Sequence, residues 1–183
     1  MKEIVQRDNP ILRIKAKEVP AKEIRSLKIR KIIKEMKEAL ASQDDGVALA
    51  APQIGVSLRI FVITEKIFDI LYPEDKLKKR EIDLVYINPK ITKLSKEQKL
   101  LEEGCLSVRW LYGKRMRSIK ATISAYNEKG EKFERGGSGL LAQIFQHETN
   151  HLDGILFTDE AQDLRELPPE QIPSRLKKDT SNA

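Results

Sequence analysis

The sequence has 183 residues, of which 40% are hydrophobic, and this predicts one soluble domain with a sizeable core. No segment is long and apolar enough to span a bilayer, and the first residues lack the features of a signal peptide, so we expect no membrane partner. The net charge of +6 comes from interspersed charges, so we expect no sequence-specific nucleic-acid partner. One unpaired cysteine excludes an internal disulfide and indicates a reducing compartment, the cytoplasm, where we expect a monomer.

The first third of the chain predicts an irregular arm, one helix and a segment of small residues. Arg7–Arg13 contains Asn-Pro and predicts a turn into an extended arm. Residues 21–42 predict a helix, because apolar residues recur there at helical spacing. The segment from Gly46 to Gly55 predicts a tightly packed loop or an edge strand that the backbone of a peptide can approach. Within it, the Gln53 side chain can offer an amide N–H to an oxyanion. The apolar positions of the helix are Ile29, Ile32, Ile33, Met36 and Leu40.

Several later segments predict strands by their β-branched and aromatic content. A charged loop is expected at residues 73–79, and the tetrapeptide Asn127 to Gly130 predicts a hairpin turn. Residues 165–183 are polar, basic and rich in proline, so we expect a loosely held tail behind a catalytic domain at residues 1–164. The predicted strands are Arg59–Thr64, Asp83–Asn88, Ile119–Tyr126 and a short strand around Lys132–Glu134.

A glycine-rich approach at residues 136–139 leads into a predicted helix from Leu140 to Gly154, which carries an HExxH pattern. His147 and His151 are four residues apart, so both imidazoles leave the same face of the helix. In such a pattern the two histidines bind a metal and the glutamate, here Glu148, handles protons. The chain has only these two histidines, which favours a metal site over two buried structural histidines.

Two histidines leave a catalytic metal one protein ligand short. The only cysteine, Cys105, is either a small buried hydrophobic residue or the third ligand. A Cys, His, His set with an open fourth position suits iron, zinc, cobalt or nickel. The expected fold class is therefore α+β, with antiparallel strands packed around a central helix that carries the metal ligands.

Three segments in this order make the chain resemble the peptide deformylase family: a GxGφAAxQ loop, an EGCφS segment and a QHExDHφxG helix, where φ is apolar. They stand here at Gly46–Gln53, Glu103–Ser107 and Gln146–Gly154. The resemblance implies the deformylase fold and removal of the formyl group from N-formylmethionyl peptides as they leave the ribosome, with release of formate. It also implies an Fe²⁺ site in which Zn²⁺, Ni²⁺ or Co²⁺ can substitute, and a transient encounter with the ribosome and nascent chain.

The resemblance also implies roles for individual residues. The ligands would be Cys105, His147 and His151, and Glu148 would act as general base and then as general acid. The Leu106 N–H and the Gln53 side chain would hold the oxyanion. The residues expected to bind the substrate are Gly46, Val47, Ala48, Leu101, Glu103, Leu140 and Ile144, with Val47, Leu101, Leu140 and Ile144 lining an apolar pocket for the methionine side chain.

Three positions depart from the family pattern. Ala48 replaces the second glycine of the first motif and adds a methyl group where backbone and substrate meet. Asn150 replaces an aspartate in the third motif, so it can keep hydrogen bonds but not a charge pair, and Arg117 is the partner expected for this position. Arg109 stands where proline is common, and it is expected to reshape the rim of the pocket together with Trp110.

Two other functions remain open at this point. A metallopeptidase of the broad HExxH class would take its third ligand downstream, where Glu160, Glu166 and Glu170 are the candidates. A basic module associated with the ribosome or RNA would have kept the fold and lost the chemistry.

Overall fold

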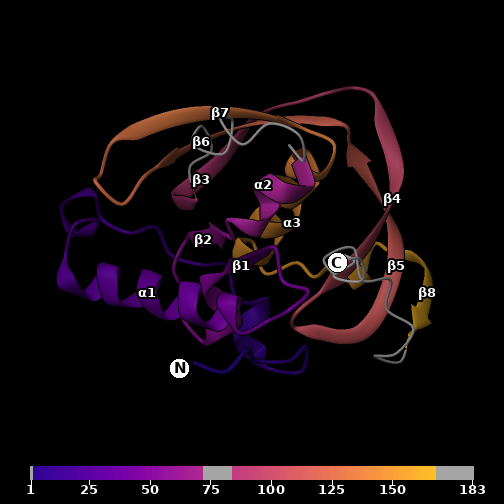
Figure 1. The fold of residues 1–183 in the computed structure, drawn as a ribbon, viewed down its shortest axis with the longest axis horizontal. Helices are drawn as coiled ribbons and strands as arrows, with labels where there is room; N and C mark the ends of the chain where they lie inside the picture. Colours follow the sequence, from indigo (N-terminus) through magenta and orange to yellow (C-terminus); the bar gives the residue numbers. More distant parts are fainter. Residues whose placement is uncertain (1, 72–83, 168–183) are drawn as a thin grey trace, which may run out of the picture.

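The computed structural model describes residues 2–71 and 84–167 (Figure 1). In this part of the chain, antiparallel strands form a five-stranded sheet in the order β1-β2-β3-β6-β7 and a three-stranded sheet in the order β4-β5-β8. The strands are β1 (Ala48–Ala50), β2 (Ile60–Ile63), β3 (Val85–Leu94), β4 (Gln98–Cys105), β5 (Val108–Ser118), β6 (Lys120–Tyr126), β7 (Lys132–Ser138) and β8 (Gln162–Glu166). The helices are α1 (Leu27–Ala41), α2 (Lys66–Leu71) and α3 (Leu140–Leu152). The expected α+β class is confirmed.

Helix α1 is shorter than the predicted helix at residues 21–42. It begins after Ser26, whose hydroxyl accepts a hydrogen bond from the Ile29 N–H (3.3 Å), which is the ordinary way for serine to cap a helix. Ala21–Glu23 forms a separate 3-10 turn. The five apolar positions predicted for the buried face of α1 are all buried, which confirms the helical spacing.

Strand β3 continues past the point where the sequence predicts its end. Asn88 adopts a left-handed conformation (φ 52°), and the pairing with β6 shifts between Ile87 and Lys90, so the chain accommodates Pro89 in a β-bulge. The Asn88 side chain bonds both backbone polar groups of Val19 at 2.8 Å. The prediction that the strand ends at Asn88 is therefore wrong, and Asp83 and the expected loop at 73–79 lie outside the described residues.

Helix α3 lies against both parts of the fold. It contacts β1, β3, β6 and β7 of the larger sheet and also β5 of the smaller one, and Figure 1 shows it in the middle of the molecule beside the long β4–β5 hairpin. The glycine-rich approach predicted before this helix is the end of β7, where Gly137 packs against Leu141 and Phe145. Burial of each large apolar side chain of α3 contributes about 1.5–3 kcal/mol, so the sheets hold this helix firmly.

The carboxyl-terminal end of the described chain is more ordered than expected. Strand β8 pairs with β5, and the Leu167 N–H donates to the Trp110 carbonyl (2.8 Å). Residues 168–183, the greater part of the expected tail, lie outside the described residues. In the part of the chain that the structure describes, no helix is long and apolar enough to cross a membrane.

Candidate metal centre

Two side chains fix α3 at the ends of its HExxH segment. The Arg59 guanidinium donates to the Leu152 carbonyl (3.2 Å) and to the Asp153 carboxylate (2.7 Å), so a buried cation sits at the negative end of the helix. At the other end, the Gln146 amide bonds both backbone polar groups of Ser118, at 2.9 Å and 3.1 Å. The turns that carry the two histidines are therefore tied to both sheets.

The structure brings the three expected ligands together. One donor atom from each of Cys105, His147 and His151 lies within 4.8 Å of the others, and Cys105 Sγ is 3.1 Å from His151 Nε2. Cys105 ends β4, and the hairpin turn that follows directs the Ser107 N–H to its sulfur (3.4 Å). Gln53 Nε2 donates to the same sulfur (3.6 Å) and to the Ser107 hydroxyl (3.1 Å), which places the predicted amide donor at the centre.

The electrostatics of the ligand set favour a cation. Burial raises the pKa of the Cys105 thiol, but the charge of His151 and a hydrogen bond from His147 outweigh it and lower that pKa to about 5. Burial lowers the pKa of His147, whereas its hydrogen bonds to Cys105 and Glu103 raise it to about 10. The site thus stabilises a thiolate by gathering positive charge around it. A divalent cation supplies the same charge, so a thiolate and two imidazoles form a suitable donor set for it.

Glu148 supplies a second indication that the residues fit a metal with bound water. Its side chain is buried, and among the described residues its Oε2 atom has no hydrogen-bond partner. Burial raises the pKa of this carboxyl group above its ordinary value. A buried polar atom without a partner needs an explanation. Here the free oxygen is suited to accept a proton from a water bound at the neighbouring metal site.

Glu103 holds His147 in position. Its carboxylate is 3.2 Å from His147 Nδ1 and receives two hydrogen bonds from Arg117, at 2.6 Å and 2.9 Å. Burial raises the pKa of Glu103, but these hydrogen bonds lower it to about 2, so the group is ionised. A carboxylate on the outer imidazole nitrogen orients a metal ligand. The structure therefore places this side chain, expected from the sequence to bind substrate, against His147, one of the expected ligands. Arg117 also donates to Asn150 Oδ1 (2.6 Å), which is the contact expected between these two positions.

Most of the other residues expected to bind substrate lie on α3 or on elements that pack against it. Ala48 and Ile144 belong to the core cluster around α3, and Val47 and Leu140 pack against it. Leu101 is half-buried and shares a face of β4 with residues 103 and 105, because alternate side chains of a strand point the same way. Gly46 lies so close to Leu106 that a Cβ atom there would be 3.2 Å from the leucine Cδ1.

A sequence profile of the family described as polypeptide deformylase matches residues 1–166. The chain belongs to this family. It is 41% identical over 159 residues to peptide deformylase 2 of Clostridium acetobutylicum, covering 87% of this chain and 94% of that protein. It is 36% identical over 181 residues to the peptide deformylase of Dehalococcoides mccartyi strain CBDB1, covering 97% and 98%.

Solved structures of deformylases share the fold. The crystal structure of peptide deformylase from Thermotoga maritima matches with a TM-score of 0.74 and 33% identity, covering 88% of this chain and 98% of that chain. A peptide deformylase from Synechococcus elongatus in complex with actinonin matches with a TM-score of 0.75 and 33% identity, covering 88% and 81%. The chain is therefore an enzyme of the deformylase class, which is metal-dependent and acts on formylated nascent peptides.

The two downstream glutamates that the structure describes, Glu160 and Glu166, do not join the expected ligands. Glu160 pairs with Arg115 (2.8 Å) and its side chain is 66% exposed, Glu166 is exposed on β8, and Glu170 lies outside the described residues. This arrangement disfavours the metallopeptidase hypothesis.

Three supporting residues were missed by sequence reasoning. Arg59, Ser107 and Gln143 act on partners from distant segments; Gln143, for example, donates to the Glu102 carbonyl at 2.8 Å. No local pattern in the sequence marks Arg59 or Gln143, because each has an ordinary place in its own strand or helix. Ser107 does stand in the EGCφS segment, and in its case only the contact with Gln53 was missed.

Proposed function

We propose that the centre formed by Cys105, His147 and His151 holds a divalent metal and hydrolyses the formamide of N-formylmethionyl peptides, releasing formate. The observation that supports this most strongly is the cluster of three donor atoms within 4.8 Å, with the unpartnered Glu148 carboxylate oxygen on the same helix. Fe²⁺ is the metal we propose, and Zn²⁺, Ni²⁺ or Co²⁺ suits the same thiolate and imidazole donors.

The reaction would divide between the metal and this chain's own side chains. A divalent cation at this site would lower the pKa of a bound water to about 7. Glu148 takes the proton of the attacking water on its free Oε2 atom and returns it to the leaving nitrogen. Gln53 Nε2 and the Leu106 N–H donate to the oxygen of the formyl group as negative charge develops there. The loss of one such donor usually lowers the rate by about 10²–10³.

The two sheets supply a path for an extended peptide. Strands β1 and β4 are both edge strands, and each leads to the centre, β1 through Gln53 and β4 through Cys105. An extended peptide can add to such an edge through backbone hydrogen bonds. The small residues of β1 let its backbone come close, and Val47, Leu140 and Ile144 offer apolar surface to the methionine side chain.

The test is formate release from formyl-Met-Ala-Ser by protein purified anaerobically with Fe²⁺. We expect turnover by the wild type and its loss in Glu148→Ala, with one metal per chain retained in both. A wild-type protein that holds metal and releases no formate would refute the function, and an active Glu148→Ala variant would refute the role of Glu148. Cleavage of internal bonds in unformylated peptides would favour the metallopeptidase instead.

The same proposal covers the setting of the enzyme. The single unpaired cysteine supports the cytoplasm, and we propose a monomer that meets the ribosome and nascent chain only transiently. Every proposed ligand and catalytic residue lies within the expected domain of residues 1–164, although β8, which pairs with β5, continues to Glu166.

A further inference from the structure

A bulge in β5 sets three residues out of register beside the metal centre. Cys105 pairs with Val108, but the next residue back on β4, Gly104, pairs with Tyr112. Residues 109–111 therefore have no partner on β4, and Trp110 has a left-handed backbone (φ 68°) that large side chains rarely adopt. Bulges re-aim side chains, and Arg109 is the first of the three residues in this one.

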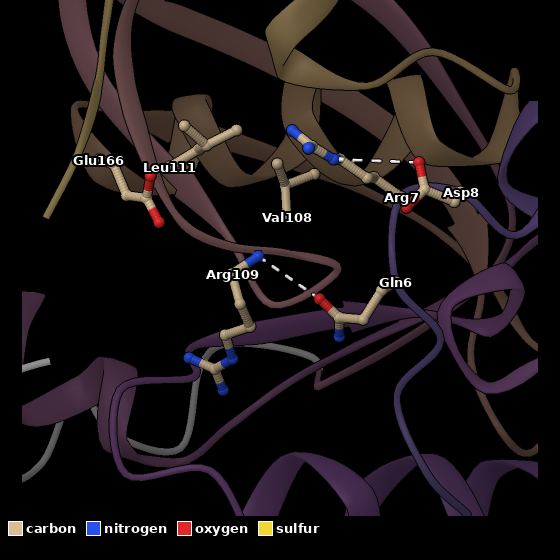
Figure 2. A pocket seen from close by; sticks show the side chains of 7 residues that line it. All are labelled: Gln6, Arg7, Asp8, Val108, Arg109, Leu111 and Glu166. Carbon is tan, nitrogen blue, oxygen red and sulfur yellow. Dashed lines mark hydrogen bonds and ion pairs between the residues drawn. The ribbon is translucent and has the colours of Figure 1, made fainter. Parts of the chain in front are cut away.

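Arg109 bridges from this bulge to the loop that leads into β1. Its guanidinium donates to Asp45 Oδ2 (2.8 Å) and to Gln43 Oε1, and it lies 5.5 Å from the Trp110 ring centroid. The Arg109 N–H is 3.4 Å from Gln6 Oε1, across a pocket of about 190 Å³ (Figure 2). Figure 2 shows that the guanidinium itself points away from the Val108 and Leu111 side chains that line this pocket.

The contacts of Arg109 with Asp45 and Gln43, called here the Arg109 bridge, lie at the end of the proposed peptide path that is farther from the metal. The direction of this path rests on the proposed function. Gln53 Oε1 accepts from the Ala50 N–H (2.8 Å) while its amide nitrogen reaches the Cys105 sulfur, so the carboxyl end of β1 is the end at the metal. A peptide with its formyl group at the metal therefore runs along β1 toward Gly46 and then Asp45. Residues beyond the methionine meet the Arg109 bridge.

Tyr112 packs on β4 at the residue before Cys105. Its ring lies over Gly104, where a Cβ atom would be only 2.6 Å from the ring. Burial and the charge of Asp45 raise the pKa of the Tyr112 hydroxyl. The Tyr112 side chain is therefore close enough to the Arg109–Asp45 ion pair to be affected by its charges. The Arg109 and Asp45 side chains are 24% and 39% exposed, so both charges are accessible to a bound peptide.

We infer that Arg109 is a specificity-determining residue that favours an acidic side chain, over a basic one, at the second or third position of the formylated peptide. Among the described residues, two partners take up two of its five N–H donors, Asp45 and Gln43, so donors remain for a peptide carboxylate. Asp45 holds the guanidinium in place, but its negative charge repels an acidic peptide side chain. Removal of this charge therefore strengthens the preference.

The test compares kcat/KM for four amidated peptides: formyl-Met-Glu-Ala, formyl-Met-Lys-Ala, formyl-Met-Ala-Glu and formyl-Met-Ala-Lys. At the position that Arg109 contacts, we expect the Glu-to-Lys ratio to fall about two- to fivefold in Arg109→Met, the range for an exposed charge pair. The change should lie in KM, because Arg109 would contact the peptide beyond the methionine and not the formyl group that reacts. It should also shrink in high salt. Arg109→Lys should keep the preference, and Asp45→Asn should increase it.

Lys37→Met is the matched control, since it also removes one positive charge and breaks an ion pair, with Glu128, on α1. It should leave all four values unchanged. Equal ratios in wild type and Arg109→Met at both positions, or the same shift in Lys37→Met, would overturn the inference while deformylation stands. A wild-type enzyme that turns over none of the four peptides would remove the proposed function and this inference together.

Discussion

The substitution Arg117→Met tests how the fold supports its metal ligands. The Arg117 side chain is 5% exposed and makes three short hydrogen bonds, two to the Glu103 carboxylate and one to Asn150. Methionine keeps most of the volume but leaves the ionised Glu103, itself 2% exposed, without the guanidinium, so that among the described residues only His147 still pairs with it. The loss of one partner of a buried ion pair costs about 3–5 kcal/mol, and two charge-assisted hydrogen bonds at about 1.5–3 kcal/mol each lead to the same range.

Urea unfolding at pH 7 measures this cost. With a slope of about 2 kcal/mol/M, the midpoint of Arg117→Met should fall by about 2 M relative to wild type. The double variant Arg117→Met with Glu103→Gln removes the stranded charge, so it should be more stable than the single variant. Arg165→Met is the control, because it breaks an exposed ion pair with Glu102 and should cost below about 1 kcal/mol.

Two results would refute this reasoning. A loss below about 1 kcal/mol in Arg117→Met would mean that Glu103 does not depend on the guanidinium. A double variant no more stable than the single one would mean that the cost comes from lost packing of the arginine and not from an uncompensated charge.

Three further predictions follow from single contacts. Cys105→Ser should weaken Co²⁺ binding and abolish the thiolate charge-transfer absorption of the Co²⁺-loaded protein; an unchanged spectrum would exclude the sulfur as a ligand. Asp159 is partly buried, which raises its pKa, but the hydrogen bond from Arg13 outweighs this and lowers it. Asp159→Asn should therefore destabilise the protein at pH 7. Its difference from wild type in thermal unfolding should begin to shrink near pH 3.8, the ordinary pKa of this group, and should vanish only below the lowered pKa of the folded state. A Cβ atom at Gly137 would lie 2.9 Å from Leu141 Cγ, so Gly137→Ala should cost about 1–3 kcal/mol in urea unfolding, and an unaffected midpoint would contradict the tight packing of α3 on β7.

The cluster of Cys105, His147 and His151, the proposed ligands, could be predicted from the sequence because its signals are local. The spacing of His147 and His151 fixes their common helix face, and the scarcity of histidine and cysteine narrows the third ligand to Cys105. The hairpin turn from Asn127 to Gly130 is local in the same way. It depends on residues within one turn of chain, so it can be predicted without knowledge of the fold, whereas the capped start of α1 at Ser26 was missed.

The β4–β5 hairpin escaped prediction because its pattern is reversed. Leu100 and Met116 face each other on the outer side at 42% and 48% exposure, while Glu103 and Arg117 face inward. A strand with charges inside and apolar residues outside does not match the alternation expected of a half-buried strand. The inward charges are explained by their partners. His147 needs an ionised carboxylate, which Glu103 supplies, and Glu103 needs a cation, which Arg117 supplies. Function thus overrides the folding pattern at this hairpin.

The same hairpin determines how the centre is assembled. Both imidazoles come from α3, which the larger sheet holds, whereas the thiolate comes from the end of β4 in the smaller sheet. The distance between them depends on polar contacts between α3 and β4, chiefly the bonds from Gln143 to the Glu102 carbonyl and from His147 to Glu103. Loss of Cys105 removes a ligand and leaves these contacts intact, whereas loss of Arg117 disturbs them and leaves every ligand in the chain. Metal affinity should therefore fall in both variants, but the stability of the metal-free protein should fall only in the second.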